Sequence, residues 1–246
     1  VVCSVRDILV NQRVDQARHD QRAADTLDRR FDAVLVHADP RLSRLEESFC
    51  PERPPTIPVH HTGFVARQRG DAGATGNVTL VTAGGGIVGH PLYHAALAAQ
   101  PRLWTERGWP MVVLAGPLFP EADRQELTSR APNDCGITLV RAVPSMAGLL
   151  GQAGRVVSQC GYNSALEILA SGKPALFVPF ARGQESEQTM RARQFADLGL
   201  SHWLSEAGLD GERLSAVLLG LQAPQTGFEL DTQGAQNRAR IVAEMA

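Results

Sequence analysis

The chain has 246 residues, of which 43% are hydrophobic and 20% charged, and its formal net charge at pH 7 is -2. These values are ordinary for a soluble globular protein of one large or two smaller domains, and no basic run favours nucleic-acid binding. No apolar run approaches the roughly 20 residues that span a bilayer. The four cysteines, without a C-x-x-C pair, favour a reducing cytoplasm over a disulfide framework or a zinc site.

The N-terminal part predicts a piece of an α/β domain. Residues 1–5 resemble a mid-domain strand, apolar residues between Val14 and Phe31 have roughly helical spacing, and 31–37 is a second candidate strand. Because the chain begins inside such a pattern, we expect it to be a fragment without its N-terminal portion. We interpret 1–67 as the remnant of an N-terminal domain and the Gly-rich residues 68–76 as a linker.

The remainder, 77–246, alternates between apolar strand patterns and amphipathic helix patterns. Such alternation is typical of a doubly wound, Rossmann-like parallel sheet covered by helices on both faces. The expected strands are 78–83, 111–115, 137–141, 155–159, 175–179 and 201–204. The expected helices are 89–100, 120–130, 145–153, 163–171, 186–198, 210–221 and 234–245. Ligands of these folds bind outside the carboxyl ends of the strands, so the turns that follow the strands are the candidate site.

The turn after the first of these strands is rich in glycine. Gly84, Gly86 and Gly89 form a G-x-G-x-x-G pattern between a strand and a helix, and Gly85 lies within it. Such a turn lets a diphosphate approach the backbone at the positive end of a helix dipole. The strand that follows lacks the acid that would hold a dinucleotide ribose, so we expect a diphosphate without NAD or FAD. The alternative is a tight turn that needs small residues for packing.

Two further turns carry candidate residues. In the first, at 141–146, Val143 and Met146 could present an apolar ledge to a planar base, although such a pair more often packs in a core. In the second, Gly161 permits close approach, and Asn163 or Ser164 can donate hydrogen bonds to phosphate or sugar oxygens. Glu167 could accept hydrogen bonds from a sugar diol. The alternative for Ser164 and Glu167 is a capping box, in which Ser caps the helix and Glu bonds back to the cap.

Glu187 and Gln188 follow a later strand, and we expect them to face the same crevice as Glu167. The alternative is that they are surface residues that open a helix, where a negative charge is favourable. We expect no metal site, since His60 and His61 are adjacent without a third ligand at a suitable spacing. We also expect no cofactor.

The run from Gly161 through Ser164 and Glu167 to Gly172-Lys173-Pro174 and Phe177-Val178-Pro179-Phe180 resembles the C-terminal domain of the family-28, MurG-like glycosyltransferases. The later pair Glu187-Gln188 also falls in register. The resemblance covers about residues 62–200. The first sixty residues, with Arg6-Asp7 and the run 32–40, are more similar to a bacterial group of predicted glycosyltransferases related to MurG.

The resemblance implies a GT-B fold, in which two Rossmann-like domains face each other and the C-terminal one holds the donor nucleotide. Glu167 would hold the ribose diol of a UDP-type donor, and Gly84 to Gly86 would line its diphosphate. Val143 and Met146 would flank the base, which reverses the core interpretation. Arg67 would neutralise the diphosphate, and Glu187 and Gln188 would contact the donor sugar. Gly86 and Cys160 stand where the lipid II enzyme of the family has serine.

The predicted activity is metal-independent transfer of a hexose or N-acetylhexosamine from a nucleotide-diphosphate sugar to an acceptor hydroxyl. The acceptor could be lipid-linked, a small molecule or a glycan, and the sequence allows peripheral membrane contact. The acceptor site and the general base of the family lie in the N-terminal domain, so no catalytic residue is named. The alternatives are a sugar-nucleotide epimerase or hydrolase of the same fold, or a donor-binding half that needs a partner chain.

Overall fold

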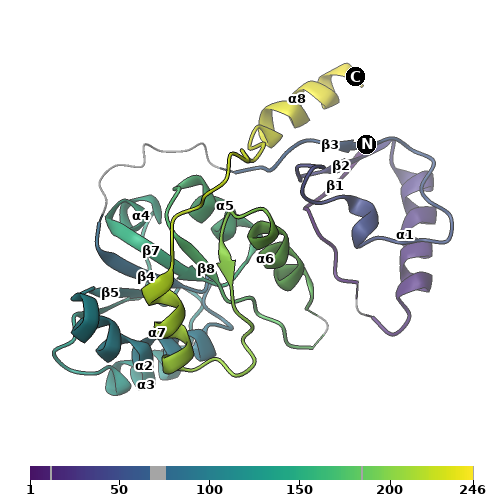
Figure 1. The fold of residues 1–246 in the computed structure, drawn as a ribbon. Coiled ribbons are helices and arrows are strands. Elements are labelled where there is room, and N and C mark those ends of the chain that lie inside the picture. The colour runs from purple at the N-terminus through teal and green to yellow at the C-terminus, as the bar shows by residue number, and fades with distance from the viewer. Residues whose placement is uncertain (12, 67–75, 184, 246) are drawn as a thin grey trace. The chain divides into compact units, whose positions relative to one another are not determined.

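The computed structural model describes residues 1–11, 13–66, 76–183 and 185–245 (Figure 1). It divides into two compact units. The N-terminal unit comprises Val1–Gln68, Ala181–Gln194 and Gly227–Ala246, and the central unit comprises Arg69–Phe180 and Phe195–Thr226. The predicted boundary at 68–76 stays a prediction, because residues 67–75 lie outside the described ones.

The central unit contains a six-stranded parallel sheet with the strand order β6-β5-β4-β7-β8-β9. Its strands are β4 Val78–Thr82, β5 Met111–Leu114, β6 Ile137–Val140, β7 Ala153–Ser158, β8 Ala175–Phe177 and β9 His202–Trp203. The order reverses between β4 and β7, which are neighbours although they are far apart in sequence. Such a switch point leaves a crevice at the carboxyl edge of a sheet, where ligands of α/β proteins collect.

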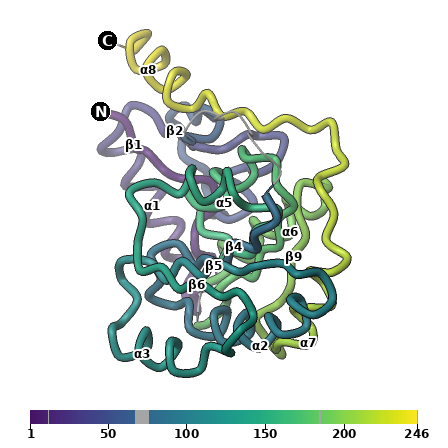
Figure 2. Tube along the Cα trace, turned by 90° about the vertical axis from the view of Figure 1, so that its left-hand side faces the viewer, coloured from purple at the N-terminus to yellow at the C-terminus, as the bar shows by residue number. Residues whose placement is uncertain are grey.

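Helices join and cover these strands. They are α2 His90–Arg107, α3 Glu121–Arg130, α4 Ala147–Gln152, α5 Tyr162–Ala170 and α7 Gly211–Gly220. Figures 1 and 2 show α2, α3 and α7 together on one side of the sheet and α5 on the other. The core lies where α2 and α7 pack on the sheet, and it includes the fully buried residues Leu103, Met111, Leu176 and Leu214. Burying such a side chain contributes roughly 1.5–3 kcal/mol.

The N-terminal unit is built on a three-stranded parallel sheet with the order β1-β2-β3. The strands are β1 Val2–Val5, β2 Ala33–Val36 and β3 Val59–His61, with the helix α1 Gln16–Arg30 and the 3₁₀ turn η1 Leu45–Glu47 between them. All four residues of the middle strand β2 are buried. Parallel strands buried in this way are uniformly apolar, as this one is.

Two later segments of the chain complete the N-terminal unit. The last segment pairs with the residues that follow β3: Phe64 donates to the Asp231 carbonyl at 2.7 Å, and α8 Gly234–Glu244 follows. The segment 181–194 contains most of α6 Glu187–Asp197. Its Arg191 forms a fully buried ion pair with Asp7, with 2.8 Å between Nη2 and Oδ1. A charged side chain that is buried away from water needs a partner of opposite charge. The ion pair therefore holds the segment 181–194 to the rest of the N-terminal unit.

The predicted α/β fold class is confirmed, and the strands and helices of the central unit lie close to their predicted positions. The main difference is α2, which was predicted to end at residue 100, before Pro101, but which continues to Arg107. Pro101 removes one hydrogen bond of the helix. The last turn holds because Leu103 is buried in the core, and Gly108 ends the helix with a φ of +62°.

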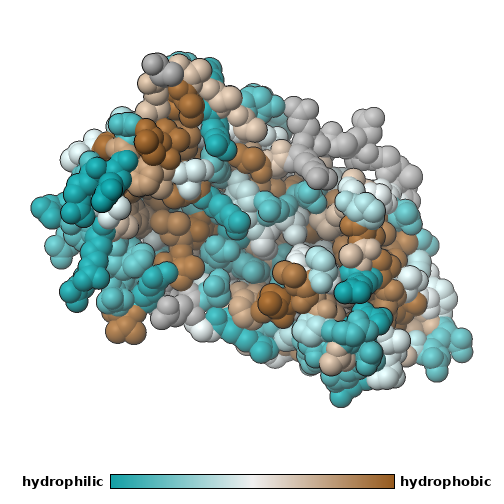
Figure 3. All heavy atoms as spheres, turned by 180° about the vertical axis from the view of Figure 1, so that it is seen from behind, coloured by the Kyte–Doolittle hydropathy of each residue, from teal (hydrophilic) through white to brown (hydrophobic). Residues whose placement is uncertain are grey.

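The surface of the described residues is mixed in character. The face in Figure 3 shows hydrophobic residues in small groups among hydrophilic ones. No helix of the described residues is long and apolar enough to cross a membrane.

Candidate functional site

The turns after β4 and β7 lie side by side, because these strands are neighbours in the sheet. A Cβ atom on Gly84 would lie 3.2 Å from Ser164 Oγ, the nearest contact at that position. Gln159, which follows β7, donates from Nε2 to the Val88 carbonyl at 2.9 Å and from its backbone N–H to the Thr82 carbonyl at 3.2 Å. The sequence predicted these turns separately, and the structure brings them together.

The glycines of the first turn are needed by its backbone conformation. Gly84 and Gly86 have φ values of +59° and +93°, where residues with a Cβ atom are strained. A Cβ on Gly86 would lie 2.0 Å from the Ala115 carbonyl oxygen. The need for a small residue in a tight turn is therefore enough to explain the glycine at position 86. Gly85 is exposed at the surface of the same turn.

Tyr93 holds the ends of β4 and β5 together. Its fully buried hydroxyl accepts a hydrogen bond from the Ala83 N–H at 3.0 Å and lies 2.8 Å from the Ala115 carbonyl, to which it donates. Its ring meets the edge of Phe119 with 5.1 Å between centroids. Burial raises the pKa of Tyr93, so its hydroxyl stays protonated. The sequence analysis did not identify Tyr93. The feature that could have indicated it is its position in the first helical turn of α2, directly after the glycine-rich turn.

The helix α5 starts earlier than a capping box requires. Its N-cap is Gly161 and its first residue is Tyr162, so Ser164 is the third residue and Glu167 the sixth. The capping-box interpretation is therefore wrong. The buried Tyr162 explains the early start, since its packing extends the helix by a turn. The N-cap residue Gly161 has no side chain with which to cap the helix. Asn163 is exposed there, and Ser164 and Glu167 are half-buried.

The turns after β5 and β6 continue the same edge of the sheet. The Leu118 N–H donates to the Gly85 carbonyl at 2.9 Å, and the Gly116 N–H donates to the Arg141 carbonyl at 2.9 Å. Leu118 is 62% exposed and lies over Gly85. Val143 and Met146 are half-buried and are not part of the central unit's buried core. Neither side chain is fully buried, and their contact with a base stays a prediction.

The structure does not test the proposed roles of the remaining predicted donor residues. Arg67 lies outside the described residues. Glu187 and Gln188 open α6 within the segment assigned to the N-terminal unit. Both side chains are half-buried, and burial raises the pKa of the Glu187 carboxyl. Their convergence with Glu167 stays a prediction.

The N-terminal unit orients a histidine at the carboxyl end of its sheet. The His37 ring lies 2.7 Å from Ser4 Oγ through Nε2 and 2.9 Å from Thr62 Oγ1 through Nδ1. The Thr62 hydroxyl donates to the Gly63 carbonyl at 2.9 Å, so it accepts from Nδ1. Nε2 is then the acceptor of the Ser4 hydroxyl proton. Burial and the charge of Arg238 lower the pKa of His37, which favours this neutral form.

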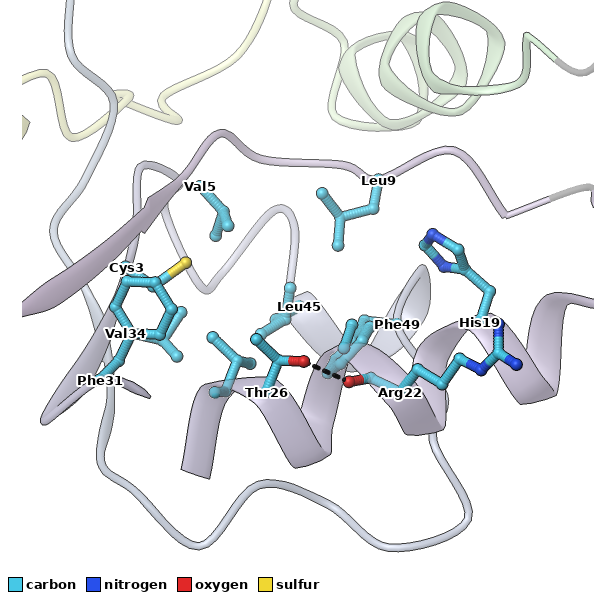
Figure 4. A pocket seen from close by; sticks show the side chains of 12 residues that line it. Cys3, Val5, Leu9, His19, Arg22, Thr26, Phe31, Val34, Leu45 and Phe49 are labelled. Carbon is cyan, nitrogen blue, oxygen red and sulfur yellow. Dashed lines mark hydrogen bonds between the residues drawn. The ribbon is translucent and has the colours of Figure 1, made fainter. Parts of the chain in front are cut away.

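The same unit has an apolar cavity of about 380 Å³ beside α1. Figure 4 shows Cys3, Val34 and Phe31 at the strands, Leu45 and Phe49 nearer to α1, and Thr26 on α1 with its hydrogen bond to the Arg22 carbonyl. Most of the lining residues are apolar, and His19, Arg22 and Thr26 are the polar ones, so the cavity suits a mainly hydrocarbon group.

Solved structures with a similar fold are glycosyltransferases of the GT-B type. MurG of Acinetobacter baumannii aligns with a TM-score of 0.59 and 19% identity over 90% of this chain and 61% of that one. CalG4, the calicheamicin glycosyltransferase, aligns with a TM-score of 0.54 and 17% identity over 90% of this chain and 51% of that one. The predicted GT-B fold is thus confirmed.

Sequence relatives point to the same group. Two carry the name UDP-N-acetylglucosamine–N-acetylmuramyl-(pentapeptide) pyrophosphoryl-undecaprenol N-acetylglucosamine transferase. The protein of Gloeothece citriformis (strain PCC 7424) is 30% identical over 118 residues, 48% of this chain and 31% of the relative. That of Nostoc punctiforme (strain ATCC 29133 / PCC 73102) is 28% identical over 170 residues, 69% of this chain and 45% of the relative.

The aligned region thus spans less than half the length of these two relatives. The profile of the glycosyltransferase family 28 C-terminal domain matches residues 80–245. This range contains the glycine turn, the start of α5 and every described residue of the predicted donor site. The chain therefore belongs to glycosyltransferase family 28 through its C-terminal domain.

Proposed function

We propose that this chain binds the donor of a glycosyl transfer reaction, in which a hexose or N-acetylhexosamine passes from a UDP-type nucleotide sugar to an acceptor hydroxyl. The observation that carries the proposal is that Gly84, in the turn that leads to α2, lies next to Ser164, in the first turn of α5. Helix N-termini attract anions through their free N–H groups and their dipoles. A diphosphate can therefore interact with both helices at once.

The start of α5 supports this use in a second way. Its N-cap residue is Gly161, which has no side chain, and a Cβ atom added there would meet no other atom within 4 Å. A ligand can therefore approach the backbone closely at the start of this helix. In the proposed complex the diphosphate lies over Gly85 and the start of α5, and Asn163 or Ser164 donates to its oxygens. Glu167 then lies further along the same helix, where its half-buried carboxylate accepts from the ribose diol.

The base and the sugar are assigned from the family. Val143 and Met146, half-exposed after the edge strand β6, are proposed to flank the uracil. Glu187, Gln188 and Arg67 are proposed to contact the sugar and the diphosphate. The relatives described above are named for UDP-N-acetylglucosamine, which favours that donor over other nucleotide sugars.

The chemical contribution of these residues is electrostatic. As the bond between sugar and diphosphate breaks, negative charge grows on the leaving diphosphate. Backbone N–H groups held by the rigid turns stabilise that charge without reorganising, and such groups are worth about 2.7–4 kcal/mol each in other enzymes. A general base must take the proton of the acceptor hydroxyl. We assign no residue of this chain to that step, and we propose that no metal ion takes part.

Calorimetric titration of the chain with UDP, GDP and dTDP tests donor binding directly. We expect UDP to bind most tightly, with a stoichiometry of one and no requirement for magnesium. The absence of binding by all three nucleotides at millimolar concentration would contradict the proposed site. With UDP-N-acetylglucosamine, release of free sugar without any acceptor would indicate a hydrolase, and a change of sugar configuration would indicate an epimerase.

A further inference from the structure

A cluster of metal-ligating side chains lies between α2 and α3. His90 and His94 are the first and fifth residues of α2, so they lie one turn apart on the same face of that helix. Their Nε2 atoms are 3.0 Å apart. Glu126 of α3 faces them, with its Oε2 3.7 Å from His90 Nε2. One ligand atom from each of the three residues lies within 4.8 Å of the other two.

These separations suit a single small cation. With metal–ligand bonds of about 2.0–2.1 Å, two ligand atoms of a tetrahedral site lie about 3.3 Å apart. The observed 3.0 Å and 3.7 Å lie on either side of that value. The imidazole rings are tilted by 45° with their centroids 4.1 Å apart, so they are not stacked.

The surroundings support the carboxylate in this role. Arg130 contacts the other oxygen of Glu126, with 3.0 Å between Nη2 and Oε1. This contact leaves Oε2 directed toward His90, and hydrogen-bonded outer partners of this kind orient metal ligands. The side chains of His90 and Glu126 are 45% and 40% exposed, so an ion can enter from solvent.

We propose that His90, His94 and Glu126 bind one divalent first-row transition-metal ion. Two imidazoles and one carboxylate suit Zn²⁺, Co²⁺, Ni²⁺ or Cu²⁺, whereas Mg²⁺ and Ca²⁺ prefer oxygen ligands alone. Three protein ligands leave at least one position open to water. The ion connects the first turns of α2 to the middle of α3, and its role is to hold these two helices together.

The proposed metal site does not depend on the proposed donor site, although His90 is the first residue of α2, whose N-terminus the diphosphate is proposed to approach. It shares no residue with that site, and the proposed transfer reaction involves no metal. Sequence reasoning missed the cluster because it considered only the adjacent His60 and His61. The signal was present in the spacing of His90 and His94, since histidines four residues apart on a helix form a metal-binding pair.

Calorimetric titration of the EDTA-treated chain with Zn²⁺ tests the proposal. We expect one strong site per chain, and at least tenfold weaker binding in the His90→Ala and His94→Ala variants. The His202→Ala variant is the matched control, since His202 is an exposed histidine on β9 of the same unit. Each titration is repeated in a Cys50→Ser background, because Cys50 is an exposed thiol that could bind Zn²⁺ itself.

Thermal unfolding gives a second readout that does not depend on titration. Zn²⁺ should raise the melting temperature of the parent chain and of His202→Ala, but not that of His90→Ala or His94→Ala. The absorption spectrum of the Co²⁺-loaded chain should show bands of nitrogen and oxygen ligands without thiolate charge transfer. Equal Zn²⁺ affinity in the parent chain and both histidine variants would overturn the proposal, as would a thiolate spectrum.

Discussion

Gly84 and Ser164 are neighbours across two turns that are eighty residues apart in sequence, and a Cβ atom on Gly84 would lie 3.2 Å from Ser164 Oγ. This proximity follows from the strand order, because β4 and β7 pair at the point where the sheet reverses. It places the starts of α2 and α5 at a single edge. The proposed diphosphate site depends on this relationship more than on any one side chain.

The first prediction concerns the glycine turn. Gly86→Ala places a Cβ 2.0 Å from the Ala115 carbonyl oxygen, at a φ of +93°. We expect it to lower the free energy of unfolding by about 2 kcal/mol or more, from backbone strain and the clash combined. Urea unfolding measures this change. Gly148→Ala in α4, where a Cβ meets nothing within 4 Å, should be neutral or stabilising.

The second prediction concerns the hydroxyl of Tyr93. Tyr93→Phe keeps the buried ring but leaves the Ala83 N–H and the Ala115 carbonyl without this partner. An unsatisfied buried polar group costs about 1–3 kcal/mol, so we expect a loss of that size in chemical denaturation. UDP binding should weaken as well, because the hydroxyl fixes the end of β4 on which the glycine turn begins. Unchanged stability would show that the hydroxyl does not hold these strand ends.

The third prediction concerns the buried pair Asp7 and Arg191, both fully inaccessible to solvent. Arg191→Met should destabilise the chain by about 3–5 kcal/mol, since it leaves a buried carboxylate without its partner. The matched control is Arg102→Met, which breaks an exposed pair with Glu106 and should cost about 0.2–1 kcal/mol. Equal effects of the two substitutions in urea unfolding would contradict the structural role of Asp7–Arg191.

The fourth prediction concerns pH. Burial lowers the pKa of both His37 and His61 below the ordinary value of about 6.5. The unfolded chain therefore binds more protons than the folded chain once the pH falls below about 6.5. Stability should be fully present above that pH and should decrease as the pH falls toward the folded-state pKa values.

Denaturation midpoints between pH 8 and pH 5 measure this dependence, and His37→Gln should reduce its slope. Glu187 acts in the opposite direction, because burial raises its pKa and its contribution is lost as the pH rises. A midpoint that increases on acidification from pH 8 to pH 5 would show that the histidines do not control this range.

The elements of the central unit could be predicted from the sequence because its strands are short apolar runs and its turns are rich in glycine and proline. Residues 78–83 were predicted as a strand, and β4 ends one residue earlier, at Thr82. The order of the strands could not be predicted, because it depends on pairings such as β4 with β7 that leave no local pattern. The contact between Gly84 and Ser164 could therefore not be predicted from the sequence, although each residue was predicted to belong to the donor site.

Two errors at the site have physical causes. Ser164 and Glu167 have the spacing of a capping box, but the buried Tyr162 extends the helix toward Gly161. Tertiary packing thus outweighed a local capping preference. Tyr93 was missed for a related reason, since its role consists of hydrogen bonds to the ends of two separate strands. Only the folded sheet brings those strand ends to one hydroxyl.

The fifth prediction tests the donor site at its proposed ribose ligand. Glu167→Gln removes a charged acceptor but keeps the shape of the side chain, and Gly161, not Glu167, occupies the cap of α5. We expect UDP binding to weaken by about 1–3 kcal/mol. Stability should change by no more than about 0.5 kcal/mol. The matched control is Glu212→Gln at the start of α7, which should leave UDP binding unchanged.

The most direct measurement is therefore the calorimetric dissociation constant of UDP for the parent chain, Glu167→Gln and Glu212→Gln, with the melting temperature of each. The account predicts weaker binding in Glu167→Gln alone, at an unchanged melting temperature. Equal UDP affinity in all three proteins, or a lower melting temperature of Glu167→Gln with unchanged affinity, would contradict it.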